Sequence, residues 1–214
     1  AMYQPPQFKA QDLAHAVNLM RCYPFASLIS NDNEGFPFVT HLPLHLEQRG
    51  EQLVLLGHIA KPNPHGAYLA LRSSALVTFM GPYAYMSPQI YPDLIRVPSW
   101  SYLTVHAKVN VTLIDDPLAK DRLLKQLIGD HEPAYKQQWI DLGTEYQHKM
   151  LAGIMGFELA IQQLDCKLKL NQHRPESHEK MHAMYAAGND NERALADWMI
   201  QLGLTNKPAE ATSI

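Results

Sequence analysis

Apolar and polar residues follow two different periods along the chain, and the two periods predict two kinds of element. In the segment 102–114 every second residue is apolar, as at Val105, Ala107 and Val109, which is typical of a half-buried strand. In the segment 11–22 the apolar positions return every three or four residues, which predicts an amphipathic helix. The chain is therefore expected to combine strands with helices.

Short apolar runs bounded by turn residues extend this interpretation. The predicted strands are 24–30, 36–46, 53–60, 75–81, 102–114 and 155–170. The predicted helices are 11–22, 64–72, one from 117 onward and 134–152, followed by a helical C-terminal region at about 176–203. The segments NDNEG and EQRGEQ separate the first three strands and are typical of hairpin turns. We expect a long ordered loop at 84–100, which is rich in proline, and a frayed tail at 204–214.

The order of these elements predicts the fold class. Strands joined by hairpins dominate, and the helices are inserted or appended, unlike the regular alternation of a doubly wound sheet. We predict a mainly β protein with added helices, in which a small antiparallel barrel spans about 20–170 and a helical extension about 175–203. The whole chain, 1–214, is expected to form a single domain.

Composition and charge narrow the classes of function. The 214 residues carry a formal net charge of −3, which argues against direct DNA contact, because such contact requires a basic surface. Two cysteines without a C-x-x-C motif predict no disulfide framework. No apolar run has the length of a membrane span, and the opening AMYQPPQF lacks the features of a secretory signal. We therefore expect a cytoplasmic protein with no membrane partner.

The segment HEKMH matches the zinc-peptidase pattern H-E-x-x-H, with His178 and His182 as candidate ligands. A working site also needs a third ligand downstream. The extended motif would place glycine and histidine where Tyr185 and Gly188 stand, and a chain with 11 histidines produces the short pattern easily by chance. We therefore predict the solvated first turn of a C-terminal helix and no metal site.

A stronger group of polar residues lies between 37 and 109. Thr40 and His41 interrupt an apolar strand, and GHIAKPNPH places Lys61 and Asn63 where a strand gives way to a helix. Backbone N–H groups at such a junction form an anion site with the helix dipole, and Lys61 adds a positive charge. Each residue alone also fits a structural role, such as a turn former for Asn63. The pattern indicates a phosphate-bearing small molecule without naming it.

Several motifs, taken together and in order, resemble the PaiB-like family of FMN-binding negative transcriptional regulators. They are MYQPPQF, PFASLIS, THLPL, GHIAKPNP, GPYAYMSPQIY, VPSWSY and KLKLNQHR. The resemblance implies a six-stranded split β-barrel related to the pyridoxamine-phosphate oxidase flavoproteins. It also implies FMN as the cofactor and a homodimer with two flavin sites at the subunit interface.

The same resemblance implies roles for individual residues. Thr40, His41 and Leu42 would follow one edge of the isoalloxazine, His58, Ile59, Ala60, Lys61 and Asn63 would hold the ribityl phosphate, and Trp100, Tyr102, Lys169, Gln172 and Arg174 would close the pocket, some of them from the second subunit. The family usually has arginine in place of Lys61. A bidentate grip on the phosphate would therefore become a single-point contact.

Three functions follow from this resemblance. The first is a flavin-dependent oxidoreductase acting on an unknown small molecule. The second is a non-catalytic, ligand-sensing transcriptional regulator without direct DNA contact. The third is a haem-binding split barrel, for which His173, His178 and His182 are the candidate axial ligands.

Overall fold

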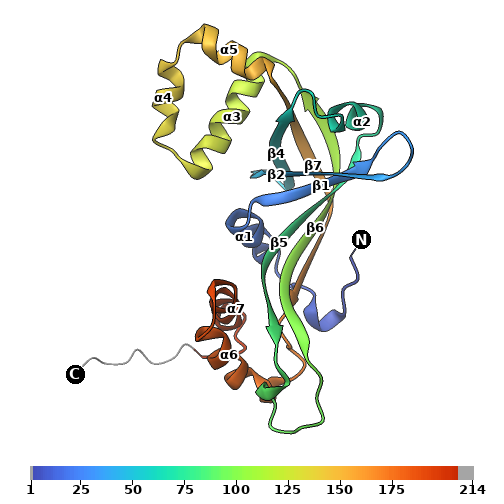
Figure 1. The fold of residues 1–214 in the computed structure, drawn as a ribbon, viewed down its shortest axis with the longest axis vertical. Helices are drawn as coiled ribbons and strands as arrows, with labels where there is room; N and C mark the ends of the chain where they lie inside the picture. Colours follow the sequence, from blue (N-terminus) through green and yellow to red (C-terminus); the bar gives the residue numbers. More distant parts are fainter. Residues whose placement is uncertain (1, 207–214) are drawn as a thin grey trace, which may run out of the picture. The chain divides into compact units, whose positions relative to one another are not determined.

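The computed structural model describes residues 2–206, which divide into two compact units (Figure 1). Unit 1 contains Leu13–Phe79 and Val105–Asp165 together with Met2. Unit 2 contains Tyr3–Asp12, Met80–Thr104 and the described chain from Cys166 onward. The predicted single domain over 1–214 stays a prediction, and most of the expected tail, 207–214, lies outside the described residues.

Antiparallel strand pairs build unit 1. Strand β1 pairs with both β2 and β5, and β4 pairs with both β3 and β7. The full strand order is β2-β1-β5-β6-β7-β4-β3. The bounds are β1 (Phe25–Asn31), β2 (Pro37–Pro43), β3 (His45–Arg49), β4 (Gln52–Ala60), β5 (Ser74–Met86), β6 (Ser99–Ile114) and β7 (Ile154–Lys169).

The connection between β2 and β3 shows that the sheet curls. These strands lie at opposite ends of the strand order, yet only Leu44 separates them in the chain. In a flat sheet the two edges would be about 29 Å apart at the usual strand spacing, whereas the link from Pro43 to His45 spans about 7 Å at most. Unit 1 therefore contains a barrel-like sheet, which confirms the predicted mainly β fold class.

The predicted strand 36–46 is wrong in one respect, because it breaks into β2 and β3. The N–H of Leu44 donates to the carbonyl of Pro24 at 3.0 Å, so the chain turns from one edge of the sheet to the other at this residue. Seven strands result, where the resemblance implied six. The close approach at this corner also requires Gly57, because a Cβ there would lie 2.5 Å from Leu44 Cδ2.

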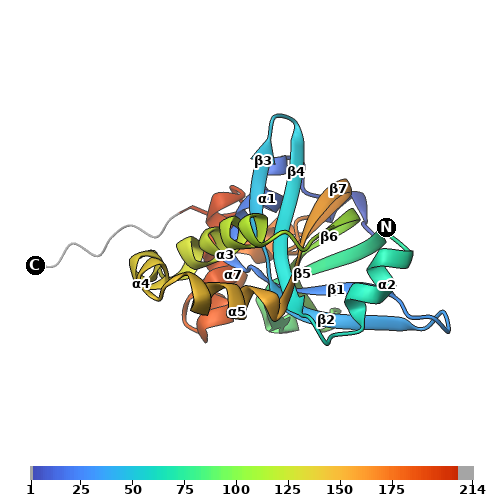
Figure 2. The ribbon, with the colours of Figure 1, turned by 90° about the horizontal axis from the view of Figure 1, so that it is seen from above.

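Five helices accompany these strands. They are α1 (Leu13–Cys22), α2 (His65–Leu71), α3 (Pro117–His131), α4 (Tyr135–Asp141) and α5 (Thr144–Ala152). Helix α3 contacts β3 and β4 (Figure 2), and its N-cap is Asp116, whose side chain accepts from the N–H of Ala119 at 2.9 Å. The single helix predicted at 134–152 is wrong, because Gly143 adopts φ +82° and separates α4 from α5.

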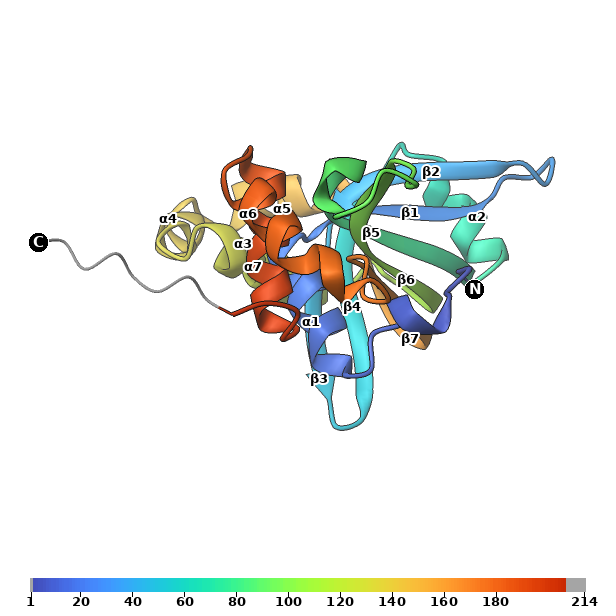
Figure 3. The same ribbon diagram turned by 90° about the horizontal axis from the view of Figure 1, so that it is seen from below.

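Unit 2 contains the remaining parts of β5, β6 and β7 and the C-terminal helices α6 (His178–Ala186) and α7 (Asp190–Gln201), which pack side by side (Figure 3). Its 3₁₀ turns are η1 (Pro6–Phe8), η2 (Pro88–Ile90) and η3 (Pro175–Ser177). The loop predicted at 84–100 is shorter than expected, because β5 extends to Met86 and β6 begins at Ser99. No helix in the described residues is both long and apolar enough to cross a membrane.

Candidate functional site

The bend that follows β4 carries a cluster of two lysines and one aspartate. Lys61 Nζ lies 3.1 Å from Asp115 Oδ1, and Lys120 Nζ lies 3.0 Å from the same oxygen. Lys120 is buried and also donates to the carbonyl of Ile154 at 3.3 Å. The hydrogen bonds from Lys120 and Lys61 lower the pKa of Asp115. Because two ammonium groups share one carboxylate, the cluster keeps one positive charge.

A hydrogen-bond network fixes Thr40 and Asn63 beside this bend. His65 is fully buried, with its Nε2 2.8 Å from Ser30 Oγ and its Nδ1 2.8 Å from Thr40 Oγ1. The side-chain amide of Asn63 donates to Thr40 Oγ1 at 3.2 Å and accepts from the N–H of His65 at 3.0 Å. Burial lowers the pKa of His65, so the ring is neutral near pH 7. The structure thus brings Thr40 and Asn63 together.

The other residues predicted in unit 1 divide into core and accessible groups. Leu42 and Ile59 are buried in the core. Ala60 and His41 are exposed, and His41 Nδ1 lies 3.0 Å from a neighbouring serine hydroxyl. His58 Nδ1 is buried and has no hydrogen-bond partner among the described residues, and burial lowers the pKa of this ring.

In unit 2 two lysines lie over aromatic rings. The ammonium groups of Lys167 and Lys169 are 5.1 and 5.7 Å from the centre of the Tyr102 ring, and Lys167 is also 5.4 Å from the Tyr3 ring. Lys169 donates to Ser99 Oγ at 2.8 Å. Within residues 2–206 neither lysine forms an ion pair with a carboxylate. Lys167 is buried, so ring faces surround its charge, whereas Lys169 is partly exposed and can contact an anion.

The remaining predicted residues of unit 2 differ in availability. The amide of Gln172 is used inside its own turn, where it donates to the carbonyl of Leu168 and accepts from the N–H of Leu170. Arg174 is exposed and lines a pocket of about 540 Å³. Trp100 is 54% exposed and lies edge-on to Tyr85, with ring centres 5.9 Å apart. Arg174 and Trp100 can therefore contact a ligand through their side chains, whereas the amide of Gln172 is already bonded to the backbone.

The histidines of the HEKMH segment are not solvated, so that prediction is wrong. His178 and His182 are 5% and 7% exposed, because α6 turns this face toward the interior of unit 2. His178 Nε2 lies 2.8 Å from the carbonyl of Asn171, so this nitrogen donates and is not available to bind iron or zinc. His173 is exposed and packs against Phe8. In the part of the chain that the structure describes, no group of three potential ligands is placed to hold a metal ion.

Two residues of these clusters could not be assigned a role from the sequence. Asp115 looks like part of the start of α3, because Asp116 and Pro117 follow it directly. His65 looks like a helix residue after the prolines. The sequence gives one weak signal for the network that joins His65 to Thr40. Histidine stands near a small polar residue both in THLPL and in GHIAKPNPH.

The residues present fit a cofactor that carries a phosphate. The lysine cluster has an excess positive charge, and the unpartnered nitrogen of His58 lies two residues before Ala60, where β4 ends. Tyr102 and Trp100 offer aromatic surface in unit 2. The curled antiparallel sheet, the lysine cluster and the aromatic side chains together place this protein in the class of flavin-binding split barrels.

The comparison with protein families agrees with this class. The chain belongs to the family described as "Putative FMN-binding domain", whose model matches residues 2–163. The PaiB-like resemblance and FMN as the cofactor are thereby confirmed. The match ends before Lys169, Gln172 and Arg174 and before the C-terminal helices.

Individual relatives support the same assignment. A protein of Bacillus subtilis, "Protease synthase and sporulation protein PAI 2", is 29% identical over 181 residues, which cover 82% of this chain and 84% of the relative. The flavocytochrome Anf3 of Azotobacter vinelandii has a similar structure, with a TM-score of 0.59, 17% identity and coverage of 77% of this chain and 70% of its own. An FAD- and heme-binding protein of Mycobacterium smegmatis gives a TM-score of 0.56 at 19% identity and covers 75% of this chain and 73% of its own. These two structures show the shared fold.

Proposed function

We propose that this FMN-binding protein works as a homodimeric flavin-dependent oxidoreductase on a small molecule. The observation that carries the proposal is the cluster of Lys61, Lys120 and Asp115 at the end of β4, because it leaves one positive charge for a phosphate. Lys61 is the phosphate contact, since its side chain is exposed whereas Lys120 is buried. When bound, FMN supplies hydride or single-electron transfer.

The chain's own residues have binding and orienting roles in this proposal. Thr40 and Asn63 are held by the His65 network, so they present fixed polar groups without losing side-chain entropy on binding. His58 gains a partner for its buried nitrogen when the site is filled. Lys169 and Arg174 provide positive charge near the ring of the cofactor, where charge stabilises a reduced, anionic flavin.

Exposed aromatic residues on one face of unit 2 support the homodimer. Along β5 the outward side chains Met80, Tyr83 and Tyr85 are 54, 52 and 51% exposed, and Trp100 on β6 is exposed as well. Tyrosine, tryptophan and methionine are enriched at protein interfaces, and monomers rarely leave large apolar patches open. A second copy of the chain is therefore the proposed occupant of this face.

A regulator that binds flavin without turnover is the second candidate. The name of the Bacillus subtilis relative, "Protease synthase and sporulation protein PAI 2", refers to sporulation, which favours a regulatory role. A net charge of −3 supports an indirect effect on transcription, through a ligand or a protein partner and without direct DNA contact. A cytoplasmic location accompanies both candidates as a proposal.

Three measurements on the purified protein test these proposals. Reconstitution with FMN should give a flavin absorption spectrum with one FMN per chain, and light scattering should give the mass of two chains. Oxidation of NADH or NADPH by the loaded protein distinguishes the oxidoreductase from the regulator. A monomer under all conditions, or FMN lost on desalting, would overturn the first proposal. Replacement of Tyr83 and Tyr85 by serine should yield monomers if the aromatic face is the interface.

A further inference from the structure

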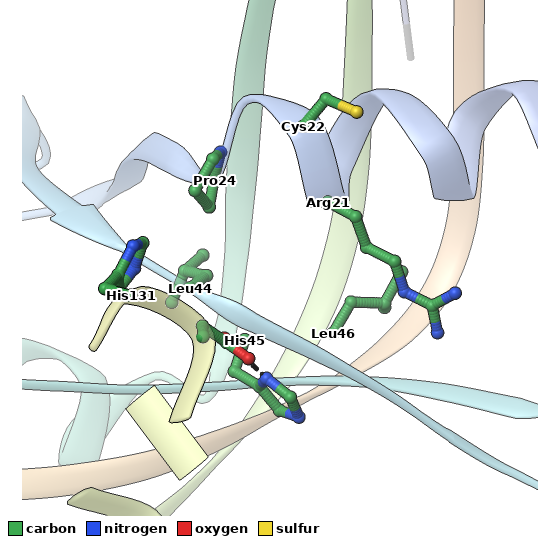
Figure 4. Close-up of a pocket in the computed structure, with 8 residues that line it drawn as sticks. Arg21, Cys22, Pro24, Leu44, His45, Leu46 and His131 are labelled. Atoms are coloured by element: carbon green, nitrogen blue, oxygen red, sulfur yellow. Dashed lines mark hydrogen bonds and ion pairs between the residues drawn. The ribbon is translucent and has the colours of Figure 1, made fainter. Parts of the chain in front are cut away.

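Unit 1 contains a pocket of about 400 Å³ that involves none of the flavin residues (Figure 4). The pocket lies where the C-terminal ends of α1 and α3 meet the start of β3. Its volume falls in the range of small-molecule sites. Three sets of lining groups differ in character: an apolar wall, an acidic side and a guanidinium.

The apolar wall is rigid. Leu44 and Leu46 are 2% and 5% exposed, and Pro24 lines the pocket beside them. The hydrogen bond from the N–H of Leu44 to the carbonyl of Pro24 fixes the two segments against each other. This wall suits an aliphatic group of a few carbon atoms.

The acidic side is formed by Asp130 and by two helix ends. Asp130 Oδ2 accepts a hydrogen bond from His45 Nδ1 at 2.6 Å, and its other oxygen has no partner among the described residues. The last turns of α1 and α3 leave backbone carbonyls without intrahelical partners, and each helix end carries partial negative charge. The Asp130 carboxylate and these carbonyl groups can together stabilise a small ammonium group.

The guanidinium belongs to Arg21 in the last turn of α1. Arg21 is exposed and forms no ion pair or hydrogen bond with any residue that the structure describes. In Figure 4 its side chain extends toward β3, the strand that carries His45, and the sulfur of Cys22 points to the other side of α1. Cys22 Sγ instead lies 3.4 Å from Asn18 Oδ1, so it is not aimed into the pocket. A free guanidinium is a ready donor pair for a carboxylate.

From this arrangement we propose that the pocket is a binding site for a free α-amino acid with an apolar side chain of about the size of leucine. The carboxylate binds Arg21, the ammonium group binds Asp130 and the helix-end carbonyls, and the side chain packs on Leu44 and Leu46. His45 is a positioning residue, because its hydrogen bond holds the carboxylate of Asp130 in place. The site is independent of the flavin, so failure of either assignment leaves the other standing.

Calorimetric titration of the FMN-loaded protein tests the proposal with three matched probes. L-Leucine should bind saturably. 4-Methylpentanoate, which lacks the ammonium group, and 3-methylbutylamine, which lacks the carboxylate, should each bind at least about tenfold more weakly, as expected for loss of a charged hydrogen bond. Equal affinity for one of these analogues would overturn the zwitterion assignment, and no binding of L-leucine would overturn the site.

Variants locate the binding. Arg21→Gln and Asp130→Asn should each weaken L-leucine binding by about tenfold or more. Arg122→Gln, which changes an exposed cation on the same unit outside this pocket, should leave the affinity unchanged. Thermal unfolding confirms that each variant is folded, and the unchanged flavin spectrum shows that the cofactor site is intact. Unaltered leucine affinity in both pocket variants would overturn the proposal.

Discussion

Lysine side chains of the two units balance their positive charge in different ways. In unit 1 the ammonium groups of Lys61 and Lys120 share the carboxylate of Asp115, whereas in unit 2 Lys167 and Lys169 lie over the ring of Tyr102. A carboxylate competes with an incoming phosphate for the same donors, and its effect is screened by salt. A ring face carries no full negative charge and does not compete in this way, although Lys169 also donates to Ser99. In unit 1 we therefore expect Asp115 to lower the affinity of the lysines for an anion. In unit 2 we expect the Tyr102 ring to position the lysines without an opposing negative charge.

Breaking the buried network of unit 1 should have the largest effect. His65→Ala removes the ring that bonds Ser30 and Thr40, which leaves the hydroxyl of Ser30 without this partner and Thr40 with Asn63 alone, and it opens a cavity. The free energy of unfolding should fall by about 3 kcal/mol. Urea unfolding measures it, with the exposed His148→Ala as control, which should change stability by less than about 0.5 kcal/mol. A small loss in His65→Ala would show that the network does not hold this corner.

The aromatic support of unit 2 should contribute less. Tyr102→Leu removes the ring beneath Lys167 and Lys169, and the free energy of unfolding should fall by about 1–2 kcal/mol. Tyr102→Phe keeps the ring face and should stay within about 0.5 kcal/mol of the natural protein. Urea unfolding at low and high salt measures both variants. Equal losses in the two would show that the hydroxyl, not the ring, is responsible.

Removing the carboxylate of Asp115, which competes with the phosphate for Lys61, should raise the affinity for FMN. Asp115→Asn frees Lys61 from its ion pair, so FMN should bind about two- to fivefold more tightly at low salt. Quenching of flavin fluorescence on titration measures the dissociation constant. The i,i+4 pair of α3 supplies the control: among the described residues Lys125 pairs with Asp121 and not with Asp115, so Lys125→Gln should leave FMN affinity unchanged. Weaker FMN binding in Asp115→Asn would contradict this account.

The last effect concerns pH. Burial lowers the pKa of His58 and His65, so each ring is neutral in the folded chain where the unfolded chain already binds a proton. As far as these two histidines determine it, the free energy of unfolding should therefore be highest above about pH 7. It should fall as the pH drops below about 6.5. Each histidine adds a slope of at most about 1.4 kcal/mol per pH unit. Urea unfolding at pH 7.5, 6.5 and 5.5 should show a shallower fall in His58→Gln than in the natural protein.

The regular elements of the fold could be predicted from the sequence because their periods are strong. The alternation around Val105 and the helical spacing of 11–22 correspond to β6 and α1. The wrong predictions occur where the backbone conformation at one residue ends a strand or a helix. Leu44 and Gly143 each break a segment that reads as continuous, through a carbonyl partner supplied by Pro24 in one case and a positive φ in the other.

The sequence motifs predicted individual residues of the candidate site but not the partners that those residues contact. Lys61 stands out by its place at a strand-to-helix junction, but its partner Asp115 is 54 residues away and carries no local signal. The burial of His178 also depends on which face of α6 packs inward, and a segment with polar residues on several sides does not reveal that face. Long-range partners and helix orientation are tertiary properties, so short patterns do not encode them.

The comparison of FMN with riboflavin tests the central claim most directly, because the two ligands differ only by the phosphate. If Lys61 and its cluster hold that phosphate, the natural protein should bind FMN at least about tenfold more tightly than riboflavin, and Lys61→Gln should reduce that ratio severalfold. Fluorescence titration of both ligands gives the ratio for each protein. Equal affinity for the two flavins, or a ratio unchanged by Lys61→Gln, would contradict the account.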